Sequence, residues 1–153
     1  MRKSSWWIFL VLLILDQWSK YLVMKNMYLG QSIPLITDVF HLTYIINPGA
    51  AFGLLANQQL FFIFVAVGVL LGGLWGIHKF SEQYGKLFVY GIVIFMAGAV
   101  GNLIDRIRFA GVVDFLDFRI WPIFNLADIG IVCGAALLGW TLWKADKKEG
   151  IEL

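Results

Sequence analysis

Charged residues are scarce in this sequence of 153 residues: Lys, Arg, Asp and Glu make up 14% of it, whereas hydrophobic residues make up 60%. That apolar content is far above the content of an ordinary soluble domain, which excludes water as the solvent for most of the chain. The net charge is only +2, so bulk electrostatics indicate neither an acidic ligand nor a nucleic-acid partner. We predict a single membrane domain over residues 1–153, with the phospholipid bilayer as its partner and no nucleic acid.

Cysteine and histidine are almost absent. Cys133 is the single cysteine, so it cannot form an internal disulfide, and the apolar run around it favours a packing role. The two histidines, His41 and His78, fall on opposite faces of the predicted membrane topology and cannot join one transition-metal site. No cofactor motif is present. We therefore expect neither a cofactor nor a metal.

A cleavage site of small residues is also missing after the first apolar run. Arg2 and Lys3 precede a run from Trp6 to Leu15, as they would in a secretory signal. Polar residues beginning at Asp16 interrupt this run, and an apolar segment follows them. A retained first spanning helix fits this pattern better than a removed leader.

Four apolar segments are long enough to cross the hydrocarbon core as helices, which takes about 20 residues. They are residues 5–24, 60–77, 87–104 and 126–143. An even number of spans puts both termini on one side, and the distribution of Lys and Arg favours the cytoplasm. The predicted fold class is a membrane all-α protein with four transmembrane helices and a short polar inner loop over residues 78–86.

Glycines recur at helical spacing within these segments. Gly68, Gly72 and Gly76 stand four residues apart, and Gly130 and Gly134 repeat the interval. Small residues at this spacing let helix backbones approach closely in lipid. We interpret these glycines as helix-packing positions.

The first outer segment is rich in β-branched and aromatic residues over residues 33–53. It contains Asn47-Pro48-Gly49, in which proline presets φ and glycine permits a positive φ, as in a tight turn. We predict a small β-rich cap on the extracytoplasmic side.

Polar residues of the first and third spans gather at the outer level of the predicted topology. Asp16 and Lys20 stand four residues apart, so a helical ion pair with a lysine that reaches the interface would account for them. Asn102, Asp105 and Arg106 share one helix face, so a hydrogen-bonded patch would account for these three. These structural interpretations stand beside a functional one, because ionisable residues at membrane depth indicate function by default.

Two acidic residues next to the fourth span suggest hydrolysis. Asn125 fits a helix N-cap and Asp128 a first-turn acid, which is a sufficient structural account of both. Asp114 and Asp128, however, would meet in a partly dehydrated site, where two acids share one proton. The ionised acid would remove a proton from water and the protonated acid would donate to a peptide carbonyl. The helix N-terminus favours Asp128 as the base.

Five segments resemble the sequence boxes of the bacterial lipoprotein signal peptidases (signal peptidase II), in the same order and with the same number of spans. They are Asp16-Gln17-Trp18-Ser19-Lys20, Asn47-Pro48-Gly49-Ala50-Ala51-Phe52-Gly53, Gly101-Asn102-Leu103-Ile104-Asp105-Arg106, Val113-Asp114-Phe115 and Phe124-Asn125-Leu126-Ala127-Asp128.

This resemblance implies a monomeric, multi-pass aspartyl endopeptidase of the bacterial inner membrane, with cytoplasmic termini and an extracytoplasmic active site. It would cleave a lipid-modified prolipoprotein immediately before its diacylglyceryl-cysteine. The implied dyad is Asp114 and Asp128. The link over residues 115–123 is unusually compact for this pattern, which would shorten a flap over the site and change the loop contacts with substrate but leaves the dyad unchanged. The implied supporting residues are Asn102, Asp105, Arg106 and Asn125 around the dyad, Asn47, Gly49, Ala51 and Gly53 along the cleft, and Asp16 and Lys20 in an outer network.

Three other functions are compatible with the same residues. A metal hydrolase could use Asp105, Asp114 and Asp128 to bind a hard cation, and a chelator would then abolish its activity. A small ion or solute transporter could use an Asp/Arg network, although such sites usually lie near the bilayer midplane. A non-catalytic scaffold could be distinguished from an enzyme only by an activity assay.

Overall fold

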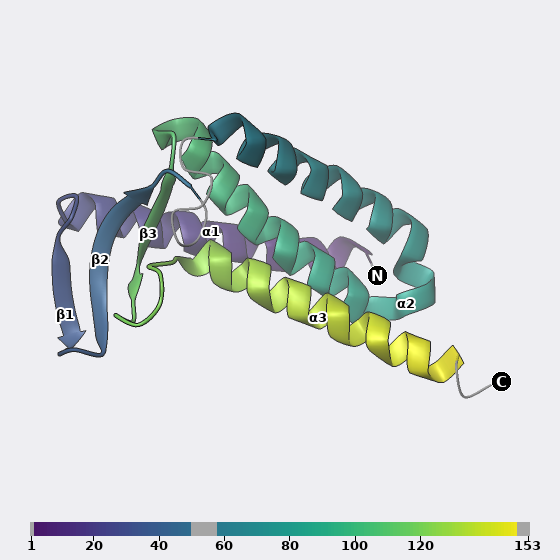
Figure 1. Cartoon of the computed structure of the whole chain (residues 1–153). Helices are drawn as coiled ribbons and strands as arrows, with labels where there is room; N and C mark the ends of the chain where they lie inside the picture. The colour runs from purple at the N-terminus through teal and green to yellow at the C-terminus, as the bar shows by residue number, and fades with distance from the viewer. Residues whose placement is uncertain (1, 50–57, 150–153) are drawn as a thin grey trace.

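The computed structural model describes residues 2–49 and 58–149. Along the chain, the elements are α1 (Arg2–Asn26), β1 (Ser32–Ile36), β2 (Phe40–Asn47), α2 (Gln59–Phe109), β3 (Val112–Asp117) and α3 (Leu126–Glu149). The helices pack on one another, and the small sheet gathers at one end of them, away from the start of α1 and the end of α3 (Figure 1).

The described residues contain three helices that are long and apolar enough to cross a membrane, namely α1, α2 and α3. Many of their large side chains face outward: Trp7 is 70% exposed and Phe64 is 73% exposed. Apolar surface of this extent is unfavourable in water and is accommodated by lipid. The prediction of a mostly helical membrane protein is confirmed.

Helix α2 is broken at Gly85, where φ is 76° and ψ is −164°. Glycine adopts a positive φ without the steric cost of a Cβ. The chain reverses there, so that an arm of residues 59–84 runs back along an arm of residues 86–109 (Figure 1). The predicted inner loop over residues 78–86 is therefore wrong. Polar residues such as Lys79 and Glu82 are good helix formers, so the first arm continues through them and one glycine makes the turn.

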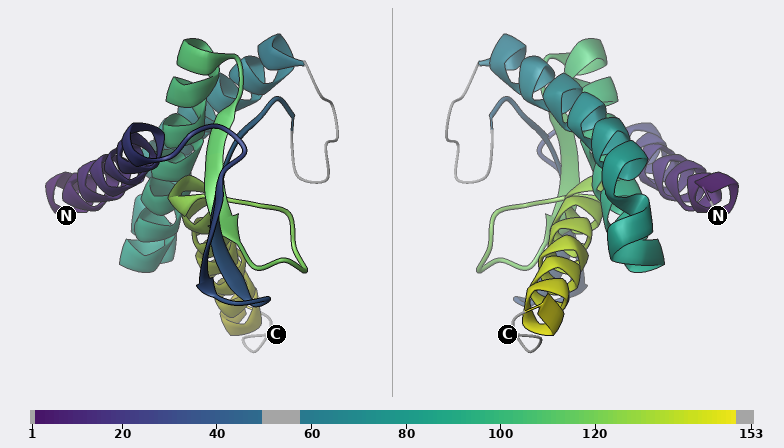
Figure 2. Two further views of the ribbon diagram at one scale, coloured as in Figure 1. Left: turned by 90° about the vertical axis from the view of Figure 1, so that its left-hand side faces the viewer. Right: turned by 90° about the vertical axis from the view of Figure 1, so that its right-hand side faces the viewer.

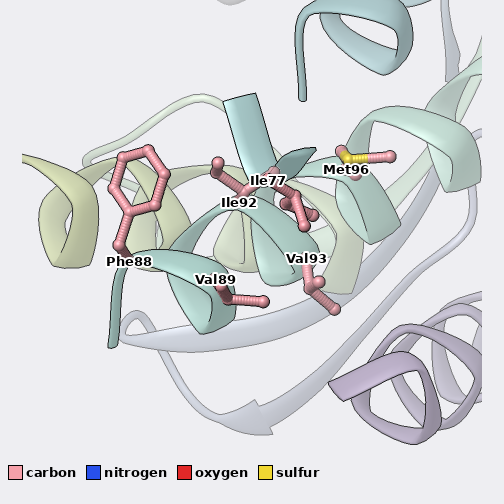
Figure 3. Close-up of a cluster of buried hydrophobic side chains, with 6 residues drawn as sticks. All are labelled: Ile77, Phe88, Val89, Ile92, Val93 and Met96. Carbon is pink, nitrogen blue, oxygen red and sulfur yellow. The ribbon is translucent and has the colours of Figure 1, made fainter. Parts of the chain in front are cut away.

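The two arms of α2 are joined by an apolar cluster near the Gly85 turn. Ile77 on the first arm packs with residues of the second arm, among which Val93 is 0% exposed (Figure 3). In lipid, such side chains stabilise the hairpin through close van der Waals packing between the two arms. The cluster consists of Ile77, Phe88, Val89, Ile92, Val93 and Met96.

The glycines of α2 and α3 divide into two groups. A Cβ built on Gly134 would lie 2.5 Å from the backbone nitrogen of Phe95, so the two helices touch backbone to backbone there, as the spacing predicts. By contrast, a Cβ on Gly68 or on Gly72 would meet no atom within 4 Å. The packing prediction is wrong for these two positions, because no described side chain faces them.

The sheet has the antiparallel order β1-β2-β3. The β-rich composition predicted the first two strands, but β3 lies in what was expected to be a loop between two spans. Ile45 on β2 pairs with Asp114 on β3, and Asn47 pairs with Val112. This register sets the side chains of Asn47 and Asp114 beside each other at the end of the strand pair.

Strand β3 is buried almost throughout. Val113 and Phe115 pack with Tyr44 of β2 and with Val23 and Met27 at the end of α1. Seen from the sheet end, the strands lie in front of the helices, and the far ends of α1 and α3 diverge (Figure 2). Strand β3 thus places Asp114 next to the start of α3.

Candidate functional site

A cavity of about 270 Å³ lies where the sheet meets α2 and α3. It is lined by polar groups from four elements or their ends and by apolar residues of the link before α3. The lining residues are Asn47, Gly49, Asn102, Arg106, Val112, Asp114, Trp121, Pro122, Ile123, Phe124, Asp128, Ile131 and Val132.

Asp114 and Asp128 reach this cavity from different elements. Asp114 lies in β3 and is 2% exposed, and Asp128 lies in the first turn of α3 and is half-buried. The structure thus brings the two acids of the predicted dyad to one cavity, in which Asp114 is buried and Asp128 is half-buried.

Asn125 is the hydrogen-bond link between the two acids. Its side-chain Nδ2 donates to Asp114 Oδ1 at 2.7 Å, and its backbone nitrogen donates to Asp128 Oδ2 at 3.1 Å. Its Oδ1 accepts from the backbone nitrogen of Asp128 at 3.0 Å. The last two bonds form a reciprocal cap of α3, so the N-cap interpretation of Asn125 is confirmed. The cap also holds Asp128 in one orientation.

Two further asparagines complete the hydrogen bonding of the acids. Asn47 Nδ2 donates to Asp114 Oδ2 at 3.0 Å, and Asn102 Nδ2 donates to Asp128 Oδ1 at 2.8 Å. Each of the four carboxylate oxygens therefore accepts a hydrogen bond from an asparagine. A carboxylate oxygen has a second lone pair, so each can still accept from a ligand in the cavity.

The electrostatic environment of Asp114 favours its protonated form. Burial, and next the nearby charge of Asp128, raise the pKa of Asp114 to about 7, against hydrogen bonds from Asn47 and Asn125 that lower it. Two acids in one dehydrated site do not both ionise readily. A pKa of about 7 leaves Asp114 protonated in about half of the molecules at neutral pH.

Lys20 is buried at the centre of a second polar cluster, behind the cavity. It is 1% exposed, and its Nζ lies 2.8 Å from Asp105 Oδ2 and 3.0 Å from Asp16 Oδ2. The predicted helical pair of Asp16 and Lys20 is confirmed. The prediction that the side chain of Lys20 extends to the membrane interface is wrong, because Asp105 of α2 neutralises its ammonium group inside the protein.

The same lysine fixes the orientation of Asn102. Lys20 Nζ donates to Asn102 Oδ1 at 3.0 Å, and Asn125 Nδ2 donates to that oxygen at 3.1 Å. An amide oxygen held by two donors leaves the amide nitrogen to face Asp128. The Lys20 cluster thus influences the cavity through the side chain of Asn102, which it orients toward Asp128.

Helices α1 and α2 also hold the backbones that carry the acids, through one carboxylate each. Asp16 Oδ1 accepts from the backbone nitrogen of Ala127 at 2.9 Å, next to Asp128. Asp105 Oδ2 accepts from the backbone nitrogen of Val113 at 3.1 Å, next to Asp114. These two carboxylates therefore hold the start of α3 and the middle of β3 in place.

Gln17 belongs to this cluster and was not among the predicted site residues. Its Nε2 lies 3.1 Å from Asp16 Oδ2, 3.2 Å from Asp105 Oδ1 and 3.2 Å from the carbonyl oxygen of Gly101. Its position three residues before Lys20, on the same helix face, is the sequence signal that would have identified it.

Arg106 lies at the edge of the cavity, away from the Lys20 cluster. Its guanidinium donates to the carbonyl oxygens of Gly49 at 3.2 Å and of Asn102 at 3.4 Å, and it stacks 4.5 Å from the ring centre of Phe62. The predicted hydrogen-bonded patch of Asn102, Asp105 and Arg106 is therefore divided, because Asp105 pairs with Lys20 instead.

Two other predicted cleft residues, Ala51 and Gly53, lie outside the described residues.

The three acids of the metal-hydrolase alternative do not converge. Asp105 is bonded to Lys20, Gln17 and the backbone of Val113, whereas Asp114 and Asp128 line the cavity. Over residues 2–49 and 58–149, no three His, Cys, Asp or Glu residues are arranged to hold a metal ion.

The link before α3 forms one wall of the cavity. The backbones of Leu116 and Phe124 are hydrogen-bonded to each other, so the chain between them projects as a compact loop. Ile120 on this loop is 93% exposed, and Trp121 is 61% exposed while lining the cavity. Asp117, at the base of the loop, accepts from Thr43 Oγ1 at 2.7 Å and from Arg119 at 3.0 Å, outside the cavity.

Comparison with known proteins identifies the family of the chain. The profile of the family described as Signal peptidase (SPase) II matches residues 8–144. The lipoprotein signal peptidase of Halothermothrix orenii is 49% identical over 140 residues, which cover 92% of this chain and 95% of the relative. That of Pelotomaculum thermopropionicum is 49% identical over 146 residues, which cover 93% of this chain and 95% of the relative.

A solved structure described as a bacterial membrane enzyme at 2.3 Å resolution is also similar to this chain, with a TM-score of 0.89 and 33% identity over 95% of this chain and 91% of its own. The fold and these relatives agree, residues from four of the five segments line one cavity, and the chain belongs to the signal peptidase II family.

Proposed function

We propose that this protein is an aspartyl endopeptidase that cleaves the signal peptide from lipid-modified prolipoproteins immediately before the diacylglyceryl-cysteine. The observation that carries the proposal is the shared cavity of Asp114 and Asp128, in which Asn125 hydrogen-bonds to both. Membership of the signal peptidase II family supports the substrate class.

In the proposed reaction, Asp128 is ionised and Asp114 is protonated. Asp128 takes a proton from water, the water oxygen bonds to the scissile carbonyl carbon, and Asp114 donates its proton to the carbonyl oxygen. Asp128 then donates its new proton to the amide nitrogen while a diol hydroxyl returns a proton to Asp114. The C–N bond breaks, and one water molecule is consumed.

The remaining polar residues orient the two acids and the peptide. Asn47, Asn102 and Asn125 hold the carboxylates, and Lys20 holds Asn102. Arg106 and Gly49 lie at the cavity edge, where a guanidinium can bind peptide carbonyl oxygens. Asp16 and Asp105 position the two backbones. Positioning of this kind accelerates reactions without entering the chemical step.

The proposed membrane arrangement has four crossings by one domain. Helices α1 and α3 supply one each, and the two arms of α2 supply the other two, since the chain reverses at Gly85. The sheet and cavity then lie on the extracytoplasmic side, and the N- and C-terminal ends lie in the cytoplasm as the Lys and Arg bias predicts. We propose that one copy of the chain suffices for activity, because all the acids and asparagines come from it.

The substrate assignment predicts strict dependence on lipidation. In bilayers, the purified protein should cleave a diacylglyceryl-modified precursor and leave the unlipidated precursor intact, because only the acyl chains bring the peptide bond to the depth of the cavity. Mass spectrometry should place the new N-terminus at the modified cysteine, with or without a strong chelator. Equal cleavage of both precursors, or loss of activity with the chelator, would overturn the assignment.

The raised pKa of Asp114 predicts a loss of activity on the alkaline side of the pH profile. Because Asp114 must be protonated to donate, and its pKa is about 7, kcat/KM should fall as the pH rises through this value. The fall should approach about tenfold per pH unit well above it. Rates on the lipidated precursor between pH 5 and pH 9 would test this, with circular dichroism as a control for folding. A rate that still rises above pH 8 would mean that Asp114 does not act as the acid.

A further inference from the structure

An apolar groove of about 480 Å³ lies on the part of the helices near the Gly85 turn. It runs between the two arms of α2 and reaches Leu138 of α3. Its wall includes a ladder of aromatic rings, in which Trp75, Phe80, Tyr84 and Phe88 contact one another in order. Side chains of Phe88, Ile92 and Met96 on the second arm are drawn in Figure 3.

Glycines line one side of this groove, which is closely packed at two of them: a Cβ on Gly73 would lie 2.5 Å from Met96 Sδ, and one on Gly76 would lie 3.3 Å from Ile92 Cδ1. Gly72, Gly73 and Gly76 line it from the first arm. A Cβ on Gly72 would meet no atom within 4 Å, so the groove beside it is not filled by described protein atoms. In a bilayer, an apolar space of this kind is filled by an acyl chain, because an empty space forfeits dispersion contacts along its whole lining.

A polar cavity of about 320 Å³ adjoins the groove and shares Tyr84 with it. Lys86 follows the Gly85 turn, and Lys144 lies on α3; both line this cavity together with Gln83, Thr141 and Trp140. Neither lysine takes part in an ion pair among the described residues, where the three pairs involve Lys20 and Arg119. The cavity therefore presents two uncompensated ammonium groups beside an apolar channel.

A third cation lies over the groove. Lys79 Nζ is 4.9 Å from the ring centre of Trp75 and 5.3 Å from that of Phe80. Both rings line the groove. Three lysines thus lie beside the apolar groove, and basic pockets between membrane helices are sites that bind anionic lipid headgroups.

We propose that the groove and the polar cavity together form a binding site for an anionic phospholipid. One acyl chain lies in the groove against the aromatic ladder, and the phosphate lies between Lys86 and Lys144. The site selects against zwitterionic lipids, because their headgroup cation would meet the ammonium groups of Lys86, Lys144 and Lys79. It lies at the opposite end of the helices from Asp114, so it serves the other leaflet and does not depend on the proposed catalytic reaction.

The test measures binding of phosphatidylglycerol and phosphatidylcholine with identical acyl chains to the full-length, delipidated protein by native mass spectrometry. Wild type should bind phosphatidylglycerol at least tenfold more tightly. The double variant Lys86→Gln/Lys144→Gln should bind phosphatidylglycerol at least fivefold more weakly than wild type does. Its affinity for phosphatidylcholine should change little. Gly72→Leu, which fills the groove, should weaken both lipids.

Two matched controls separate this site from general effects. Lys25→Gln/Arg108→Gln removes two exposed cations at the sheet end, and Gly68→Leu adds the same side chain at an open position that does not line the groove. Both should bind lipid as wild type does. Equal affinity of wild type for the two lipids, wild-type binding by the double lysine variant, or wild-type binding by Gly72→Leu would each overturn the proposal.

Discussion

Replacement of Asp114 or Asp128 by asparagine is expected to reduce kcat/KM for the lipidated precursor by about a thousandfold or more, because proton transfer by a positioned side chain accounts for about 10²–10⁴ in rate. Asparagine has nearly the same shape as aspartate and can keep one hydrogen bond to Asn125, so both variants should fold. Cleavage in reconstituted bilayers, followed by gel shift and mass spectrometry, measures the loss.

Asp117→Asn is the matched control for this experiment. Asp117 lies on the same strand as Asp114, but its carboxylate is bonded to Thr43 and Arg119 and does not line the cavity. Its variant should cleave at close to the wild-type rate. Full turnover by either Asp114→Asn or Asp128→Asn would refute the dyad, and equal loss in all three variants would point to misfolding of β3.

The second large effect is expected from Lys20→Met. The substitution leaves Asp16 and Asp105 buried without their shared cation, and loss of one partner from a buried ion pair costs about 3–5 kcal/mol of stability. For a chain of this size, that corresponds to a fall in Tm of about 6 to 20 °C. Thermal unfolding in one detergent, followed by circular dichroism, would measure it.

Controls for Lys20 come from the same helix and from its partners. Lys25→Met removes an exposed lysine that stacks 5.8 Å from the ring of Tyr21, and its Tm should stay close to wild type. A triple variant, Lys20→Met with Asp16→Asn and Asp105→Asn, removes all three charges and should recover part of the lost stability. If Lys20→Met and Lys25→Met had the same Tm, the buried cluster would not stabilise the fold.

The two acids of the candidate dyad could be predicted from the resemblance of their segments to a known family, and some of the contacts around them follow from local spacing. Asn125 and Asp128 are three residues apart at the start of α3, so a local capping rule describes their contact. The ion pair of Asp16 and Lys20 follows from the i, i+4 spacing in the same way. Local spacing therefore identified these two contacts within single helices.

Contacts between distant segments could not be predicted. The pairing of Lys20 with Asp105 joins two helices, and the side chain of a buried lysine cannot be distinguished by sequence from one that reaches the interface. Strand β3 lies in the segment that the sequence predicts as a loop between the third and fourth spans, and only the register with β2 explains why Asp114 is tolerated there. Gly72 has the spacing of a packing glycine but borders an open groove.

The ion pair within α1 has a consequence for biosynthesis. Helix α1 leaves the ribosome before either arm of α2, so it enters the bilayer before Asp105 exists. Because Asp16 and Lys20 lie one turn apart and 3.0 Å from each other, the helix can insert with its two opposite charges already compensated, which lowers the cost of placing them in hydrocarbon. Asp105 then arrives later, on a hairpin that meets a lysine already in the membrane. The order of synthesis thus matches the order in which the buried charges find partners.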